Sequence, residues 1–224
     1  MSFVLKELKN NRLKVQKNIS DVDCDYVGGK INSTVLHKMI KNGYEDNPKK
    51  TSNLNGYVMD KSLSGTRAQV YYHPETKHLV VNHRGTKGIH DVMTDINLML
   101  GHKSGKRFEH GKKITDQALK KYNTDNVTIS GHSLGAEVAR QASKSDKHDV
   151  VVVNPAVAPL DMFNKQKDNE MIIRSKLDPI SALHNFNPFR NEAKTIDIDA
   201  KSYNPLTEHS SDILERLGDV DVGV

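Results

Sequence analysis

The stretch VTISGHSLGAEVAR, at residues 127–140, constrains the fold more than any other part of this sequence. Four β-favouring residues lead into a turn that places Ser133 between two glycines, and a helix-favouring run follows at once. Flanking positions must be small where the backbone turns this sharply, because neighbouring Cβ atoms would clash. The pattern is G-x-S-x-G with a strand before it and a helix after it, which is typical of a nucleophilic serine. The alternative is a glycine-rich turn with an incidental serine.

The order of segments around this turn predicts an α/β fold with a mostly parallel central sheet and helices on both faces. An amphipathic helix is expected over 112–122, then a strand over 126–130, the helix over 134–143 and a strand over 149–154. The last strand contains the run VVVV, as expected for a strand buried on both faces of a parallel sheet. Further strands are predicted upstream and downstream of this unit: a hairpin over 67–73 and 78–85, and strands over 170–176 and 195–200.

The N-terminal part of the chain is predicted to be helical. Residues 1–20 form a Lys-rich helical segment, and a second helix begins at Asn32 or Ser33, runs to about Lys41 and is stopped by Gly43. The apolar residues of this second helix recur on one face: Val35, Leu36, Met39 and Ile40. A polar loop follows it, so we divide the chain into a helical extension over 1–50 and an α/β domain over 51–224. A third helical segment is expected near 91–100.

The composition excludes several classes of protein. The 224 residues are 36% hydrophobic and contain no apolar run long enough to span a membrane, no secretory signal and only Cys24 for disulfide formation. These features predict an intracellular product or a component of an assembly. The net charge is +5, but the lysines are spread along the chain, so we expect transient contact with an anionic membrane surface and no nucleic-acid binding. The sequence indicates no oligomeric state.

A serine hydroxyl is nearly inert at neutral pH and needs a general base that an acid orients. In this fold class the acid and the base follow the serine in that order. Asp178, in MIIRSKLDPIS, follows a predicted strand, although an Asp-Pro turn without a catalytic role explains it equally well. Two histidines lie downstream, His184 and His209. We favour His209, because it lies beyond another strand and directly before a predicted terminal helix.

Several segments together resemble the class 3 lipases, the fungal-type branch of the α/β-hydrolases. NHRGTKGIHDVMTDINLML looks like the segment in which a strand ends at Arg-Gly-Ser/Thr and runs into a lid helix. FEHGKKI is similar to the family's His-Gly step before the next helix, with His110 and Gly111 in those places. VTISGHSLGAEVA, RSKLDPIS and TEHSSDI resemble the segments of the nucleophile, acid and base. The resemblance extends over about residues 56–214 and implies an α/β-hydrolase fold.

The resemblance also implies a role for each matching residue. Ser133 becomes the nucleophile, Asp178 the orienting acid and His209 the base. Thr86 lines the oxyanion hole with its backbone N–H and its hydroxyl, opposite the backbone N–H of Leu134. The lid spans residues 87–93, and its apolar residues are Ile89, Val92 and Met93.

Three other polar residues lie close to these positions. Asp91 and Asp95 are expected to cap or anchor the lid helix. His132, beside the serine, is expected to be packed and not catalytic.

The activity implied by the resemblance is hydrolysis of carboxylic esters of lipids by a lipase or phospholipase, with no metal and no other cofactor. The positive net charge favours anionic phospholipid over neutral triacylglycerol as the substrate. The chain departs from the family in the loop VVVNPAVAPLD and in a lid without tryptophan. The alternative is a lipase-like fold that acts as a non-catalytic binding or structural component.

Overall fold

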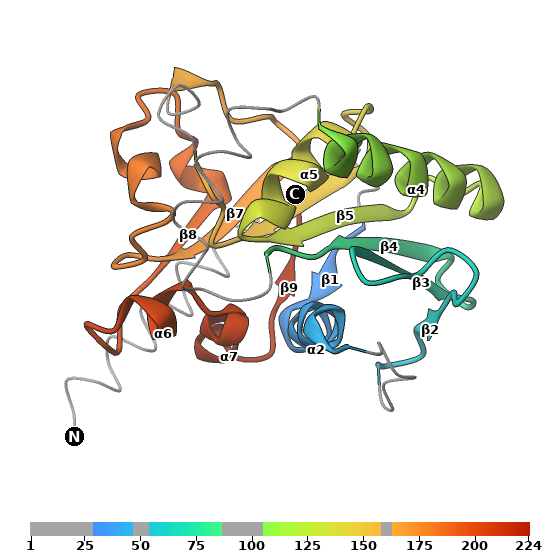
Figure 1. Ribbon diagram of the computed structural model, residues 1–224, viewed down its shortest axis with the longest axis horizontal. Helices are drawn as coiled ribbons and strands as arrows, with labels where there is room; N and C mark the ends of the chain where they lie inside the picture. The colour runs from blue at the N-terminus through green and yellow to red at the C-terminus, as the bar shows by residue number, and fades with distance from the viewer. Residues whose placement is uncertain (1–28, 47–53, 87–104, 158–162) are drawn as a thin grey trace.

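A computed structural model of the chain describes residues 29–46, 54–86, 105–157 and 163–224. A seven-stranded sheet forms its centre, in the order β2-β3-β4-β5-β6-β7-β8 (Figure 1). The strands of this sheet are β2 (Val58–Met59), β3 (Ala68–His73), β4 (His78–His83), β5 (Val127–His132), β6 (Asp149–Val153), β7 (Glu170–Ser175) and β8 (Thr195–Ile198). The helices are α2 (Ser33–Tyr44), α4 (Lys106–Tyr122), α5 (Leu134–Ala142), α6 (Pro205–His209) and α7 (Leu214–Leu217). The remaining elements are the 3₁₀ turns η2 (Ala182–Phe186), η3 (Glu192–Lys194) and η4 (Ser211–Ile213) and the paired strands β1 (Ile31–Asn32) and β9 (Asp221–Val222).

The strands run parallel to one another from β4 to β8. At the other edge, β3 pairs antiparallel with both β4 and β2. The β3–β4 hairpin is the one expected from the sequence. The parallel strands end at a common edge of the sheet, so the residues that follow β4, β5, β6 and β7 gather there. This edge carries the candidate site.

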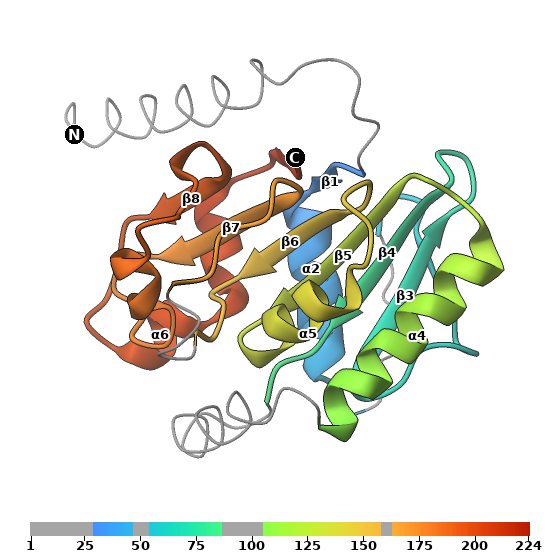
Figure 2. The same cartoon turned by 90° about the horizontal axis from the view of Figure 1, so that it is seen from above.

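Helices cover both faces of the sheet, as predicted. In Figure 2, α4 and α5 lie across one face, while α2 lies behind the sheet. Alternate residues of a strand point to opposite faces. In β6, Val150 and Val152 pack into the core under α4 and α5, and Val151 and Val153 pack into the core with α2. The uninterrupted valine run therefore supplies both cores, and the α/β fold class is confirmed.

Helix α2 begins where the sequence predicts and ends later. The side chain of Asn32 caps it by accepting hydrogen bonds from the backbone N–H groups of Thr34 and Val35. The expected stop at Gly43 is wrong, because the helix continues to Tyr44. Gly43 is buried, and a Cβ there would come within 2.5 Å of the Gln69 side chain on β3. The glycine lets the helix lie close to the sheet instead of ending it.

Helix α4 begins earlier than predicted. It starts at Lys106, so Gly111 lies inside the helix and not in a step before it. A Cβ at Gly111 would clash with the side chain of Val138 on α5. A helical glycine costs about 1 kcal/mol relative to alanine, and here it permits close contact between two helices.

Some predictions fall on residues that the structure does not describe. These are the helical segments over 1–20 and 91–100. Helix α2, by contrast, contributes to the same hydrophobic core as β4 and β6. The domain boundary at residue 50 stays a prediction. Within the described ranges, no helix combines the length and the apolar character needed to cross a membrane.

Candidate active site

Ser133 lies on the turn that joins β5 to α5. Its backbone has φ +58° and ψ −126°, a conformation that costs a non-glycine residue about 1–3 kcal/mol. Both neighbouring glycines are sterically required. A Cβ at Gly131 would collide with the backbone of Gly135, and a Cβ at Gly135 would collide with the backbone of His83 on β4. The strained turn therefore holds the serine at the C-terminal edge of the sheet and at the N-terminus of α5.

Three side chains predicted from the sequence meet at this edge. The His209 Nε2 atom lies 2.9 Å from Ser133 Oγ, and the His209 Nδ1 atom lies 2.9 Å from Asp178 Oδ1. All three residues are buried. An imidazole placed between a hydroxyl and a carboxylate can take the hydroxyl proton while the carboxylate fixes its tautomer.

Asp178 is held in a tight turn after β7. Its Oδ1 atom also accepts the backbone N–H of Ile180 at 3.0 Å, and its Oδ2 atom accepts that of Ser181 at 3.2 Å. The side chain is fully buried. Because both oxygens have donors, the carboxylate presents a fixed edge to His209.

Asn154, which the sequence did not single out, fixes the backbone around His209. It follows β6 with φ +41°, and its Nδ2 atom donates to the carbonyls of Glu208, at 2.8 Å, and Ser210, at 3.2 Å. Its Oδ1 atom accepts the backbone N–H of Ser175 at the end of β7. The signal in the sequence is weak: an asparagine before a proline, at the end of a buried strand.

Glu208, the neighbour of the histidine, is a second anchor. Its carboxylate accepts hydrogen bonds from Arg216, from the Ser175 hydroxyl and from the backbone N–H groups of Lys201 and Ser202. Burial alone would raise the pKa of this carboxyl, but the bonds from Arg216 and Ser175 outweigh burial and lower the pKa to about 2. Glu208 is therefore ionised at neutral pH and ties the end of α6 to β7 and α7.

The end of β4 lies beside the serine. A Cβ at Gly85 would come within 3.0 Å of Ser133 Cβ and within 2.7 Å of the His132 carbonyl, so only glycine fits this approach. Thr86 follows, and no described residue offers a hydrogen-bond partner to its buried Oγ1 atom. Leu134 is the first residue of α5, so its N–H has no acceptor within the helix.

Other predicted residues do not join this cluster. The lid residues Ile89, Val92 and Met93 lie outside the described residues, as do Asp91 and Asp95. His184, the alternative base, lies in η2, and its Nε2 atom has no hydrogen-bond partner among the residues that the structure places. Burial, followed by three nearby arginines, lowers the pKa of His184 to about 3.

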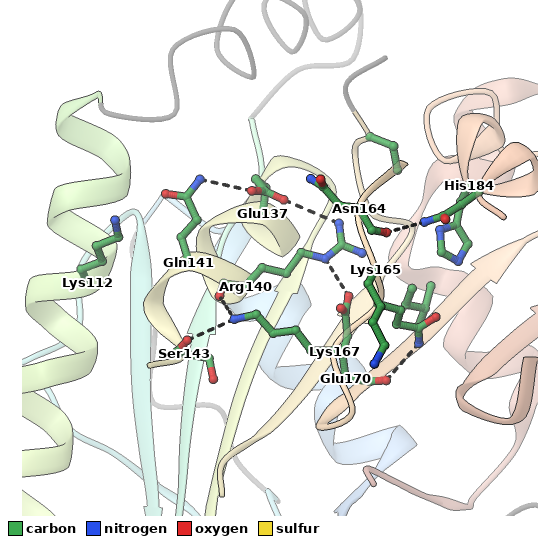
Figure 3. A pocket seen from close by; sticks show the side chains of 14 residues that line it. Lys112, Glu137, Arg140, Gln141, Ser143, Asn164, Lys165, Lys167, Glu170 and His184 are labelled. Atoms are coloured by element: carbon green, nitrogen blue, oxygen red, sulfur yellow. Dashed lines mark hydrogen bonds and ion pairs between the residues drawn. The ribbon is translucent and has the colours of Figure 1, made fainter. Parts of the chain in front are cut away.

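His184 lines a pocket of about 310 Å³ beside α5 (Figure 3). Polar side chains make up most of its lining. Arg140 Nε lies 2.6 Å from Glu170 Oε1, and Lys167 donates to the carbonyls of Arg140 and Ser143. Neither Ser133 nor His209 lines it. We assign it no part in the chemistry at Ser133.

One group in the described ranges has the spacing of metal ligands: His37, Asp212 and Glu215. Its two carboxylates lie against different nitrogens of the same ring, at 3.0 Å and 3.6 Å, and Lys41 lies 3.2 Å from Asp212. These ion pairs account for the cluster, and we assign no metal there.

A mostly parallel sheet with a serine on a strand-to-helix turn, bonded to a histidine–aspartate pair, defines the class of the α/β-hydrolases. Within this class, the chain belongs to the phospholipase-like family described as the Tle-like phospholipase domain, which matches residues 37–178. The matched span contains Ser133 and Asp178 and ends before His209.

The fold is similar to that of solved lipases. The crystal structure of Lip2 lipase from Yarrowia lipolytica has a TM-score of 0.52 and 14% identity, over 77% of this chain and 82% of that chain. The structure of nonglycosylated Yarrowia lipolytica LIP2 lipase has a TM-score of 0.49 and 15% identity, over 75% and 79%. The first shows the shared fold, and with the family match it confirms the lipase-like resemblance. A comparison with curated proteins found no match.

Proposed function

We propose that the chain hydrolyses carboxylic esters of lipids, with Ser133 as the nucleophile, His209 as the general base and Asp178 as the orienting acid. The observation that carries this proposal is the pair of 2.9 Å hydrogen bonds through His209, which connect a strained serine to a buried carboxylate. Membership of a phospholipase-like family supports a lipid ester as the substrate.

Acylation begins when Ser133 Oγ attacks the ester carbonyl carbon while His209 Nε2 accepts the hydroxyl proton. The new C–O bond converts the carbonyl into a tetrahedral oxyanion. When the oxyanion collapses, the bond to the alcohol breaks, and His209 gives its proton to the leaving oxygen. In deacylation, water loses a proton to His209 while its oxygen attacks the acyl carbonyl. When this second tetrahedral intermediate collapses, the bond to Ser133 Oγ breaks, His209 returns the proton to Ser133 Oγ, and the fatty acid leaves.

The oxyanion needs two donors close to Ser133. The backbone N–H of Leu134 can be one of these donors, because Leu134 is the first residue of α5 and the N-terminus of a helix carries partial positive charge. Thr86 follows the glycine that packs against the serine. Its Oγ1 atom has no hydrogen-bond partner among the residues that the structure describes, which supports a role toward a bound substrate. We assign these two residues to the oxyanion hole.

The substrate class follows from the family and the charge. We expect phospholipids to be preferred over triacylglycerols, since the chain carries a net charge of +5 and anionic headgroups are attracted to it. Contact with an anionic membrane surface is transient in this proposal.

Covalent labelling tests the proposal. A fluorophosphonate probe should label the wild-type protein at Ser133, and Ser133→Ala should remove the label. Liposomes containing anionic phospholipid, assayed beside a series of p-nitrophenyl esters, should then report the headgroup and chain-length preference. If well-folded wild-type protein takes up no label and hydrolyses none of these esters, the fold serves as a non-catalytic binding or structural component.

Asp178→Asn should lower kcat by about 10⁴-fold. The asparagine amide can present an N–H to His209 Nδ1, which favours the tautomer that carries its proton on Nε2 and cannot accept the serine proton. The remaining amide oxygen still accepts a backbone N–H of the turn, so the fold should persist. Steady-state hydrolysis of a p-nitrophenyl ester measures the effect, and Asp199→Asn, at an exposed position, is the control. Equal rates for the two variants would exclude Asp178 as the acid.

A further inference from the structure

His132 stands between Gly131 and Ser133 and is expected from the sequence to be merely packed. It is buried, and both nitrogens of its ring have partners. The Nδ1 atom lies 2.7 Å from the Tyr44 hydroxyl, and the Nε2 atom lies 2.7 Å from the backbone carbonyl oxygen of His209. Its ring therefore connects the last residue of α2 to the histidine of the site.

The partners determine the direction of each hydrogen bond. A carbonyl oxygen only accepts, so the Nε2 atom of His132 must carry the proton and Nδ1 must be the acceptor of a neutral ring. The Tyr44 hydroxyl then donates to Nδ1, and its lone pairs accept the backbone N–H of Gly85 at 3.1 Å. Burial, and then the adjacent His209 ring, lower the pKa of His132 to about 3, which keeps the ring neutral at physiological pH.

Both ends of this chain of bonds belong to residues that lie beside Ser133. Gly85 leads directly into Thr86, which we assign to the oxyanion hole, and the other end is the backbone of His209. Since Gly85 has no room for a side chain, its position is set by Tyr44 and by the turn at Ser133. Helix α2 thus reaches the reaction centre through one hydroxyl group.

We propose that Tyr44 and His132 are positioning residues that hold the Gly85–Thr86 backbone and the His209 backbone in one fixed arrangement. The inference rests on the proposed function and extends it to α2. The bond from His132 also adds to the hydrogen bonds that hold the backbone around His209. Asn154 donates to the carbonyls of Glu208 and Ser210, and His132 donates to the carbonyl between them. Three consecutive carbonyls are held by side chains from the ends of β5 and β6.

Such support acts on the transition state. The base must face Ser133 while the oxyanion donors face the developing charge, and a misplacement of about 1 Å can cost about 10²-fold in rate. Loss of the Tyr44 hydroxyl leaves the Gly85 N–H without its acceptor and lets His132 reorient. Both side chains are buried and hydrogen-bonded within the protein, so the proposal gives neither a contact with the lipid, and kcat should change while KM should not.

The test compares two buried tyrosines. Tyr44→Phe should lower kcat by about 10- to 100-fold and leave KM within about twofold. Tyr71→Phe is the matched control. Its hydroxyl is also buried and lies 2.8 Å from Asn42 Nδ2 on the same helix, and within the described ranges no hydrogen bond joins it to His132, Gly85 or His209. Tyr71→Phe should lower the melting temperature and leave kcat unchanged.

His132 variants give a second comparison. His132→Phe removes both bonds, whereas His132→Gln keeps an amide N–H that can reach the His209 carbonyl, so His132→Gln should retain more of kcat. This comparison decides the question if Tyr44→Phe fails to fold. If Tyr44→Phe matches Tyr71→Phe in kcat, or if the two His132 variants are equally active, the inference is overturned while the proposed function stands.

The hydrogen bonds can also be tested without turnover. Nitrogen-15 NMR of histidine-labelled protein should show His132 as the neutral Nε2–H tautomer near pH 7, and Tyr44→Phe should shift its Nδ1 signal. An Nδ1–H tautomer would overturn the chain of bonds, whether or not the protein hydrolyses esters. Absence of fluorophosphonate labelling in the wild type would instead overturn the proposed function.

Discussion

His209→Ala should lower kcat for ester hydrolysis by about 10⁶-fold, a loss as large as that from removing the nucleophile. No other histidine of the described site can replace it. The ring nitrogens of His132 are bonded to Tyr44 and to the His209 carbonyl, so neither is free to accept the serine proton. His184 lies in a separate pocket and not against Ser133. Without a base, the Ser133 hydroxyl keeps its proton and attacks the ester only at the slow rate of a free alcohol.

The measurement is kcat with a saturating p-nitrophenyl ester, supported by the rate of fluorophosphonate labelling. His184→Ala is the matched control, because it also removes a buried imidazole but leaves the bonds to Ser133 intact. It should retain activity within a few fold once its melting temperature shows that it is folded. An active His209→Ala beside an inactive His184→Ala would mean that the base is assigned to the wrong histidine.

The parts of the site that local chemistry determines could be predicted from the sequence. A serine between glycines, after a strand and before a helix, predicts a nucleophile. The order of acid and base along the chain favours Asp178 and His209 over a plain Asp-Pro turn and His184, and the structure brings these two side chains and Ser133 together. The valine run of β6 likewise reports burial on both faces of a sheet. In each case a few consecutive residues are enough for the prediction, because backbone sterics and strand periodicity determine the local structure.

The supporting residues could not be predicted in this way. Tyr44 lies 88 residues from His132 in the sequence, and His132 lies 77 residues from His209. A short stretch of sequence cannot predict such pairs, because they form only when α2 packs against the sheet. The predictions at Gly43 and Gly111 are wrong for the same reason. Alone, each resembles a helix boundary, but in the fold each permits a close contact that the sequence does not display.

Buried histidines should make this domain unfold in mild acid. His78, His83, His132 and His184 are all buried. Burial, with nearby positive groups, lowers the pKa of His78 to about 4 and those of the other three to about 3. In the unfolded chain a histidine has a pKa of about 6.5. Below that pH the unfolded state binds protons that the folded state does not, so the free energy of unfolding falls as the pH falls.

The size of this effect is large for a domain of ordinary stability. Each differentially bound proton changes the free energy of unfolding by about 1.4 kcal/mol per pH unit, so four give about 5 kcal/mol per pH unit near pH 5. Total stabilities are about 5–15 kcal/mol. We therefore expect unfolding between about pH 6 and pH 4. Carboxylates with lowered pKa values, such as Glu208, act in the same direction, but only as the pH falls below about 4.5.

The interval between pH 7.5 and pH 5 isolates the histidines, because carboxylates of the unfolded chain stay largely ionised there. Urea unfolding followed by circular dichroism at several pH values in this interval gives the slope directly. His83→Gln should reduce the slope by about one proton. A stability that is flat down to pH 5 would mean that these rings take up protons in the folded state. His132 would then be protonated in mild acid, and the Tyr44 hydroxyl could no longer donate to its Nδ1 atom at that pH. Its Nε2–H would still donate to the His209 carbonyl, so the support of the reaction centre near Gly85 would be lost before the support near His209.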